Sequence, residues 1–206
     1  MVSKYLLMKT DRRQDILKAA MELFARKGFR GTTTRDLATQ AEINEAIIFR
    51  HFKNKEDLYS AILEHKACES RAAQTEELDR LASANDDEAF FQELARNFLK
   101  KHQQDTTFLR LLLFSALEGH QLSEMFASTI TDRNPMLNYI TTYIQRRIDE
   151  GVFANTDPQL AARAFVSMFA SHVIFHEILG MNKTETYDSE QIVQTFVSIF
   201  LKGIAK

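Results

Sequence analysis

The stretch TTTRDLATQAEINEAIIFRHFKNKEDL, Thr32 to Leu58, holds two short segments with helical apolar spacing, separated by a turn and followed by a basic tail. Thr33 can accept a hydrogen bond from an amide of the first helical turn, and Asp36 three residues later completes a capping box. After three turn residues comes Asn44, a good cap for a second helix. We therefore predict helix, turn and helix over about residues 33–52.

In the second helix, Ile48 and Phe52 are one helical turn apart and form the predicted buried face. A rotation of 100° per residue places Ala46 and Arg50 on the opposite face, with Ile47 on its flank. A small residue such as Ala46 allows close approach to base edges, and the Arg50 guanidinium can donate two hydrogen bonds to guanine. An apolar side chain such as that of Ile47 can contact a thymine methyl group. The spacing is that of a helix-turn-helix motif, whose second helix enters the DNA major groove.

A helix precedes this motif, because Ile16, Ala20, Leu23 and Phe24 follow helical spacing and Gly28 provides a residue type that ends helices. Residues 1–60 contain 12 Lys/Arg and 8 Asp/Glu, a local charge of +4, although the whole chain carries −2. A basic amino-terminal part fits a nucleic-acid partner.

The whole chain has 206 residues, 45% of them hydrophobic and 26% charged, which is typical of a globular protein. Its one cysteine, Cys68, cannot form an intrachain disulfide. A lone cysteine on a polar stretch is better explained as an incidental residue than as a redox sensor. The apolar runs are too short or too interrupted for a signal peptide or a membrane span. We predict a cytoplasmic protein without a membrane partner.

The six glycines and two prolines fall between long segments of helical apolar spacing, so the predicted fold class is all-α. The segment TTFLRLLLFSALEG is apolar nearly all round in its middle, which predicts a buried helix at the centre of a larger domain. Two apolar stripes follow near the end of the chain. They suit either intramolecular packing or a subunit interface, and we assign these residues to a candidate dimer interface: Phe165, Met168, Phe175, Leu179, Ile192, Phe196, Ile199 and Phe200.

The segment from about Asp11 to Leu63 resembles the DNA-binding domain of the TetR family of bacterial transcriptional repressors. ILKAAMELFARKGFRGTTTRDLA and FRHFKNKEDLYSAI are each close to that family's pattern, in register. IQRRIDEGVFANTDPQLAARAFVSMF resembles the start of the last two helices of the family's ligand-binding and dimerisation domain. The resemblance implies a three-helix DNA-binding domain at 10–63 and a helical effector-binding and dimerisation domain at 64–206. It also implies a homodimer on a near-palindromic, double-stranded operator, released by a small-molecule effector through the long fourth helix.

Transferred residue by residue, the resemblance implies phosphate contacts for Thr34, Asn44, His51 and Lys55, and base contacts for Glu45, Ala46 and Arg50. The full predicted DNA-binding set is Thr33, Thr34, Arg35, Asn44, Glu45, Ala46, Ile47, Phe49, Arg50, His51 and Lys55.

Three residues depart from the family pattern. Phe49 stands where the family has a tyrosine, so it lacks a hydroxyl for phosphate. Glu42 replaces a turn glycine, and a positive φ there costs on the order of 1 kcal/mol. Glu45 is acidic beside phosphates, and we hypothesise that it accepts a hydrogen bond from a cytosine amino group.

Ten of the sixteen phenylalanines lie between residues 90 and 175, where a lipophilic or aromatic effector would find an apolar pocket with a few polar groups. Core packing explains most of them equally well. The predicted pocket residues are Phe98, Phe108, Arg110, Leu112, Phe114, His120, Phe126, Phe169, His172 and His176. His172 and His176 have a spacing that could bind zinc, but histidines on an apolar helix are more often hydrogen-bonding groups, so we predict no metal and no cofactor.

An enzyme is the first competing class, and a helical small-molecule binding protein or carrier without DNA function is the second. The sequence contains no nucleophile elbow, phosphate-binding glycine loop, zinc-protease motif or dinucleotide fingerprint. We therefore predict a ligand-responsive DNA-binding regulator that is not an enzyme.

Overall fold

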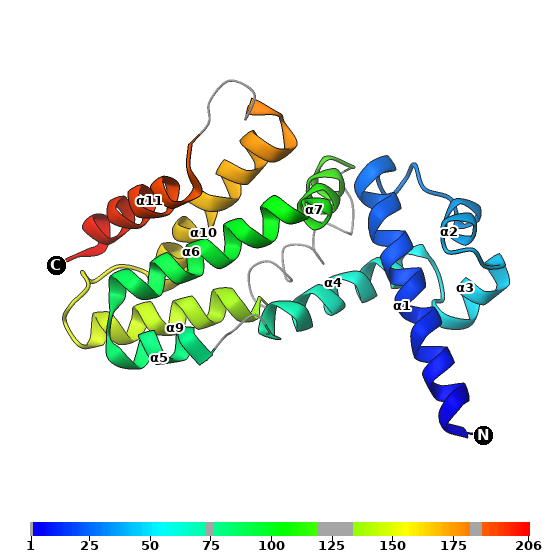
Figure 1. Cartoon of the computed structure of the whole chain (residues 1–206), viewed down its shortest axis with the longest axis horizontal. Coiled ribbons are helices and arrows are strands. Elements are labelled where there is room, and N and C mark those ends of the chain that lie inside the picture. The colour runs from blue at the N-terminus through cyan, green and yellow to red at the C-terminus, as the bar shows by residue number, and fades with distance from the viewer. Residues whose placement is uncertain (1, 73–75, 119–133, 182–186) are drawn as a thin grey trace. The chain divides into compact units, whose positions relative to one another are not determined.

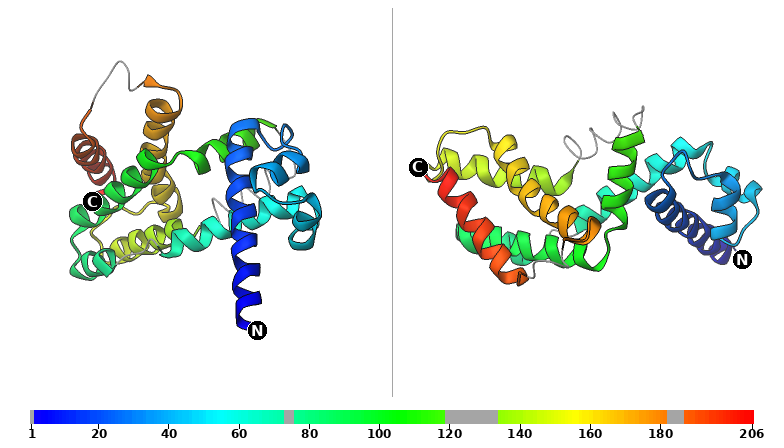
Figure 2. Two further views of the ribbon diagram at one scale, coloured as in Figure 1. Left: turned by 45° about the vertical axis from the view of Figure 1, so that its right-hand side comes forward. Right: turned by 90° about the horizontal axis from the view of Figure 1, so that it is seen from above.

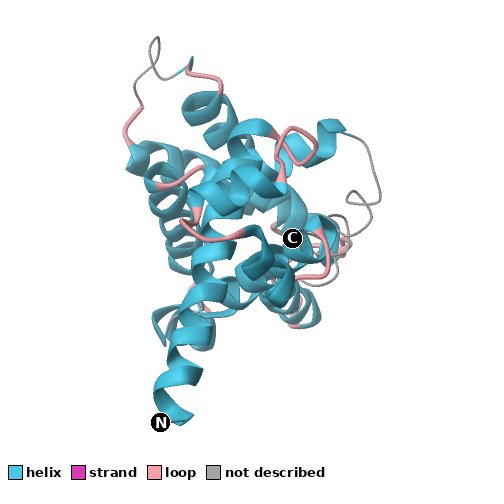
Figure 3. Cartoon of the chain, turned by 90° about the vertical axis from the view of Figure 1, so that its right-hand side faces the viewer, coloured by secondary structure: helices cyan, strands magenta, loops and turns pink. Residues whose placement is uncertain are grey.

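The computed structural model describes residues 2–72, 76–118, 134–181 and 187–206, and over these ranges the chain is helical with only one isolated β-bridge, between Phe153 and Ala205 (Figure 3). The all-α prediction is confirmed. The chain forms two compact units: a head unit, residues 1–67 and 107–130, and a body unit, residues 68–106 and 131–206. Every helix of the described ranges falls short of the length and apolar character needed to cross a membrane.

Local signals set the helix ends of the head unit. It contains α1 (Val2–Lys27), α2 (Thr34–Gln40), α3 (Glu45–His51), most of α4 (Lys55–Ala72) and α7 (Thr107–Glu118) (Figure 1). Gly28 has φ 76° and ends α1, because a glycine takes this left-handed conformation without a steric penalty. The side-chain oxygens of Thr33, Asn44 and Asn54 accept hydrogen bonds from first-turn amides of α2, α3 and α4, as their positions predict.

One hydrophobic core joins all the helices of the head unit. The inward positions predicted from the sequence are buried, among them Phe24 of α1, Leu37 of α2 and Ile48 of α3. Tyr59 of α4 is fully buried, and its hydroxyl lies 2.6 Å from the Ser115 hydroxyl of α7. Burial raises the pKa of Tyr59. The core therefore includes a helix from the middle of the chain.

The packing of α7 differs from the sequence-based expectation. The apolar segment Thr107–Glu118 is predicted at the centre of the larger domain, but α7 packs along α1 in the head unit. Its buried residues Leu111, Leu112 and Ser115 face the core formed with α1 and α4. An apolar helix shows only that it is buried, and the choice of partner depends on long-range packing.

The body unit contains α5 (Glu76–Ala84), α6 (Asp87–Gln104), α9 (Pro135–Asp149), α10 (Pro158–Val173), a π-helical turn (Ile174–Ile178) and α11 (Ser189–Ile204). Pro158 lies in the first turn of α10, directly after the capping residue Asp157. Helix α6 contacts α5, α10 and α11, while α9 packs on α10 (Figure 2).

Aromatic side chains fill the core of the body unit. The ring of Phe91 on α6 lies 4.9 Å from that of Phe165 on α10 and 5.0 Å from that of Phe200 on α11. Phe90 stacks on Tyr143 of α9 at 3.9 Å between ring centroids. Together these contacts give the unit a core without requiring a partner molecule.

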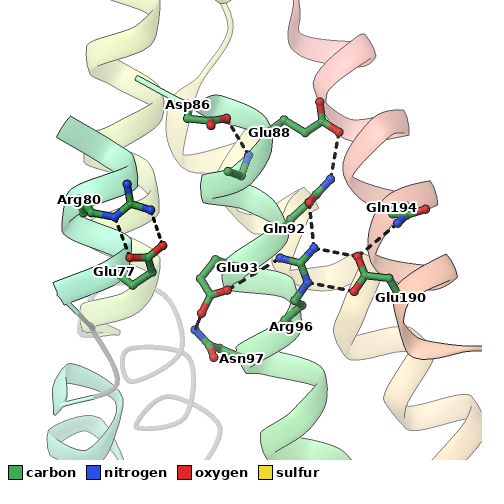
Figure 4. Close-up of polar contacts among 11 residues, drawn as sticks. Glu77, Arg80, Asp86, Glu88, Gln92, Glu93, Arg96, Asn97, Glu190 and Gln194 are labelled. Carbon is green, nitrogen blue, oxygen red and sulfur yellow. Dashed lines mark hydrogen bonds and ion pairs between the residues drawn. The ribbon is translucent and has the colours of Figure 1, made fainter. Parts of the chain in front are cut away.

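Ion pairs join the body helices around this core. Arg147 of α9 is buried and donates two hydrogen bonds of 2.8 Å to the carboxylate of Asp87 on α6. At the surface, Arg96 of α6 donates two hydrogen bonds to Glu190 of α11, of 3.0 and 2.8 Å (Figure 4). Bidentate arginine–carboxylate pairs fix geometry as well as charge, so they align α6 with both neighbours.

Three residues of the predicted dimer interface belong to this core instead. Phe165, Ile192 and Phe200 are buried, with 3, 6 and 6% of their surface exposed. The apolar stripes of α10 and α11 are wide enough to cover two faces, and the inner side of each packs on α6 and its neighbours. Sequence spacing shows that a stripe exists but not which part of it faces the core.

Candidate DNA-binding site

The amino-terminal end of α2 is fixed by the predicted capping box. The Thr33 hydroxyl accepts a hydrogen bond from the Asp36 amide at 3.1 Å, and the Asp36 carboxylate accepts one from the Thr33 amide at 2.9 Å. Lys27 at the end of α1 donates to the same carboxylate at 3.0 Å. The hydrogen bonds from Thr33, more than the Lys27 charge, lower the pKa of Asp36. This end of α2 is therefore held in one orientation, with Thr33 and Arg35 exposed.

The turn between α2 and α3 has the predicted conformation. Glu42, which stands where a glycine was expected, has φ 53°. Asn44 then caps α3 by accepting the Ala46 amide at 2.9 Å. Ile43 and Ile47 pack partly against the head core, and Ile48 and Phe52 are buried in it. The two helices of the motif are thus attached to the core on both sides of the turn.

Helix α3 presents the outer face predicted for a recognition helix. Ala46, Phe49 and Arg50 are exposed, and Phe49 has 52% of its surface accessible. The exposed Phe49 ring is accessible to a partner group. Ile47, in contrast, packs partly against the core, so it is less available to a base than we predicted. His51 is half-buried beside the Phe52 ring.

Thr34 and Glu45 are joined to each other. The Thr34 hydroxyl at the start of α2 donates a hydrogen bond of 2.7 Å to the Glu45 carboxylate at the start of α3. We had predicted separate roles for them, a phosphate contact for Thr34 and a base contact for Glu45. The hydrogen bond couples the starts of α2 and α3. A partner molecule that bonds to the Thr34 hydroxyl or to the Glu45 carboxylate would therefore break this contact and release the other group.

Lys55 takes a different position from the one predicted. Its ammonium group donates to the carbonyl oxygens of Phe29 and Thr32 at 2.6 and 2.7 Å and lies 4.3 Å from the centroid of the Phe29 ring. Desolvation lowers the pKa of Lys55. Its three possible donors are largely engaged inside the head unit, so Lys55 is not arranged for a phosphate contact.

The described residues of the predicted effector set are divided between the two units. Phe108, Arg110, Leu112 and Phe114 lie on α7 in the head unit, where Leu112 is part of the core. Phe169 is buried in the body core, and Phe98 lies against the ring of His102 at 4.4 Å. His120 and Phe126 lie outside the described residues. The aromatic clustering seen in the sequence thus reflects core packing in two units for most of these residues.

Two hollows on the body unit are lined by other residues. One, of about 420 Å³, lies between α9 and the start of α10 and is lined by Thr141, Thr142, Gln145, Arg146, Asp149 and Pro158. Another, of about 290 Å³, lies between α6 and α11 and is lined by Arg96, Leu99, Lys100, Gln103, Gln104, Ser189, Glu190 and Val193. Neither contains a residue of the predicted effector set.

His172 and His176 stack with their ring centroids 4.2 Å apart at the junction of α10 and the π-helical turn, and the Phe196 ring of α11 lies 6.1 Å from that of His172. Burial, and to a smaller extent the neighbouring His176, lowers the pKa of His172. Among the described residues there is no group of three or more His, Cys, Asp or Glu that could hold a metal ion.

Exposed apolar residues of the predicted interface occur on the π-helical turn, at its end and on α11. Phe175, Leu179 and Ile199 from the predicted interface are 49, 65 and 58% exposed, and Met168 and Phe196 are partly exposed. Large exposed apolar side chains of this kind are candidates for burial in a protein–protein interface. We refer to Phe175, Leu179 and Ile199 as the apolar face.

Comparison with known proteins identifies the class to which this arrangement belongs. Residues 16–62 match the bacterial regulatory proteins of the tetR family, and residues 89–203 match the C-terminal domain of AefR-like transcriptional repressors. The chain therefore belongs to the TetR family of helix-turn-helix transcriptional regulators, with a carboxy-terminal part of the AefR-like kind.

Individual relatives agree with this assignment. The HTH-type transcriptional regulator YvkB of Bacillus subtilis is 26% identical over 192 residues, which cover 92% of this chain and 95% of YvkB. The fatty acid degradation regulator FadR of Bacillus halodurans is similar in structure, with a TM-score of 0.74 at 18% identity over 93% of this chain and 98% of that one. FadR of Bacillus subtilis in complex with stearoyl-CoA has a TM-score of 0.71 at 17% identity, over the same shares of the two chains.

Proposed function

We propose that the protein is a transcriptional repressor that binds a near-palindromic operator as a homodimer in the cytoplasm and is released by a lipophilic effector. The observation that carries the operator proposal is the exposed face of α3, where Ala46, Phe49 and Arg50 project from a helix whose opposite side is anchored in the head core. This combination suits direct contact with base edges in a major groove.

The contacts that position the head on DNA would come from the start of α2 and the flanks of α3. Thr33 and Arg35 are exposed at the start of α2. Asn44 and His51 flank the recognition helix at its two ends. We keep Asn44 and His51 as proposed phosphate contacts and add Thr33 and Arg35 from the predicted DNA-binding set. We remove Thr34, because its hydroxyl is bound to Glu45, and Lys55, because its ammonium group is bound to Phe29 and Thr32.

The apolar face supports the homodimer proposal. A patch placed on a two-fold axis meets its own copy, so one set of exposed apolar residues is enough to build both halves of an interface. Dimerisation would also place the two recognition helices about 34–36 Å apart, which is one turn of the DNA helix, or at a multiple of that distance, so that they meet successive major grooves.

The effector proposal has support of a different kind. The structurally similar FadR of Bacillus subtilis was solved with stearoyl-CoA, a ligand with a long acyl chain. The body unit of this chain has a core rich in phenylalanine, into which an apolar ligand could insert if α6, α10 and α11 separate slightly. An effector that releases the operator must bind the released state more tightly than the DNA-bound state.

The direct test is to select fragments from a random double-stranded DNA library with the purified protein and to sequence them. An enriched inverted repeat is the expected result, and failure to enrich any sequence with a folded dimer would refute operator binding. Arg50→Ala should abolish the enrichment. Arg80→Ala is the matched control, because Arg80 is exposed on α5 of the body unit, where it pairs with Glu77.

A further inference from the structure

The turn between α1 and α2, residues 28–33, is held by two groups of opposite charge from distant parts of the chain. On its amide side, the Glu118 carboxylate at the end of α7 accepts hydrogen bonds from the Phe29 amide at 3.0 Å and from the Arg30 amide at 3.2 Å. Glu118 is 88 or 89 residues away in sequence. An anion bound to two consecutive amides is a strong, charge-assisted contact.

On the carbonyl side, the Lys55 ammonium group of α4 donates to the oxygens of Phe29 and Thr32. Thr32 is itself buried, and its hydroxyl donates to the Gly28 carbonyl at 2.8 Å. Two amides of the turn are therefore bound by the Glu118 carboxylate of α7, and two of its carbonyls are bound by the Lys55 ammonium group of α4.

Gly28 makes room for this arrangement. A β-carbon added at Gly28 would lie 2.2 Å from Oε1 of Glu118, and the residue has φ 76°. The glycine thus serves two purposes at one position, because it adopts the left-handed conformation that ends α1 and leaves the space that the carboxylate occupies.

The far end of the same turn is Thr33, the capping residue of α2. Any change in the turn alters the direction in which α2 presents its first amides and Thr34. Thr34 is hydrogen-bonded to Glu45, so the start of α3 follows the start of α2. The conformation of the turn therefore influences the orientation of both α2 and α3, the two helices of the proposed DNA-binding surface.

We propose that Glu118 and Lys55 are positioning residues for DNA binding, which act by fixing the turn at residues 28–33 rather than by touching DNA. The inference rests on the operator binding proposed above. Removal of the Glu118 or the Lys55 contact would leave the turn in its DNA-binding conformation for only a fraction of the time. The apparent dissociation constant for operator DNA then rises by the inverse of that fraction.

A positioning role for Glu118 and simple charge repulsion predict opposite effects of its removal on operator affinity. Removal of an acidic residue from a DNA-binding unit should strengthen DNA binding, since it reduces repulsion of the phosphates. Glu118→Gln should instead weaken operator binding, by about tenfold if the competent conformation falls to about one tenth. Glu64→Gln is the matched control: it makes the same change of charge at an exposed position of α4 and should leave binding unchanged or slightly tighter.

Lys55 is tested by salt dependence. A lysine that neutralises a phosphate contributes about 0.9 to the slope of log affinity against log salt concentration. Lys55→Met should weaken operator binding with the slope unchanged, because the ammonium group is bound to carbonyl oxygens. A slope reduced by about 0.9 for each protomer would show that Lys55 contacts phosphate in the complex and would overturn its positioning role.

Both measurements should use the full-length protein and fluorescence anisotropy with the operator fragment selected by the wild type. Titration at concentrations well above the dissociation constant gives the active fraction, so that partial unfolding of a variant is not read as weak binding. Operator affinity equal to or higher than wild type in Glu118→Gln would refute the inference. A wild type that binds no operator, or an Arg50→Ala variant that binds normally, would refute the proposed function itself.

Discussion

Replacement of Ile199 by aspartate tests the proposed dimer most directly. Ile199 lies on the outer side of α11 and is 58% exposed, while its neighbours on the inner side, such as Val197 and Phe200, are buried. A polar residue there should leave the fold of the single chain intact. If the apolar face is the centre of a two-fold interface, the substitution enters that interface twice.

The expected magnitude follows from this exposure. Complete burial of an isoleucine side chain contributes about 1.5–3 kcal/mol, so covering the exposed 58% contributes about 0.9–1.7 kcal/mol in each protomer. Loss of both side chains therefore costs the dimer at least about 2 kcal/mol, which raises its dissociation constant about 30-fold. Two carboxylates brought together in an apolar interface add a further cost.

Sedimentation velocity of both proteins over a concentration series measures the dissociation constant. Val152→Asp is the matched control, because it places the same acidic group at an exposed apolar residue outside the apolar face. We expect the control to behave as wild type and Ile199→Asp to dissociate at concentrations where wild type is dimeric. An unchanged dissociation constant for Ile199→Asp would refute the assignment of this face, and a monomeric wild type would refute the dimer.

Other predictions concern the body unit and base recognition. Arg147→Leu leaves the Asp87 carboxylate without its buried charged partner, although the Tyr143 hydroxyl still donates to it. We expect the free energy of unfolding to fall by about 3 kcal/mol and the melting temperature, measured by circular dichroism, to fall by about 6–12 °C. A fall in melting temperature of less than about 2 °C would contradict this. Burial lowers the pKa of His172 below 6.5, so the unfolded chain binds the proton more readily and stability falls as the pH falls below about 6.5. In urea unfolding, the free energy of unfolding should fall less between pH 7.5 and pH 5.5 in His172→Phe than in wild type. An equal fall in both proteins would show that His172 does not cause the pH dependence. Glu45→Ala should change the base preference at one position of each half-site, and an unaltered set of selected sequences would remove the cytosine hypothesis.

The ends of the head helices could be predicted from the sequence because their causes are local. The caps at Thr33, Asn44 and Asn54 bond to amides two or three residues away, and Gly28 ends α1 through its own backbone freedom. The positive φ of Glu42 follows from its place in a turn of known geometry. Such interactions are complete within a few residues, so they can be recognised in a linear sequence.

The contacts of Lys55 and α7 could not be predicted in this way. Lys55 stands in a basic segment and matches a family position, yet its ammonium group binds carbonyl oxygens 23 and 26 residues earlier in the chain. The sequence contains no signal that Glu118 would bind the turn after α1. Long-range contacts of this kind depend on which surfaces meet, and many pairs of charged residues are compatible with one sequence.

The sequence alone therefore determined the all-α class, the helix-turn-helix motif and the outward face of Ala46 and Arg50, because helical periodicity and capping chemistry act over one or two turns. Only the tertiary structure decided that α7 belongs to the head, that Phe165, Ile192 and Phe200 are core residues, and that the outer apolar face is left exposed. An apolar residue gains free energy from any surface that removes it from water, so its partner is fixed by packing of the whole chain.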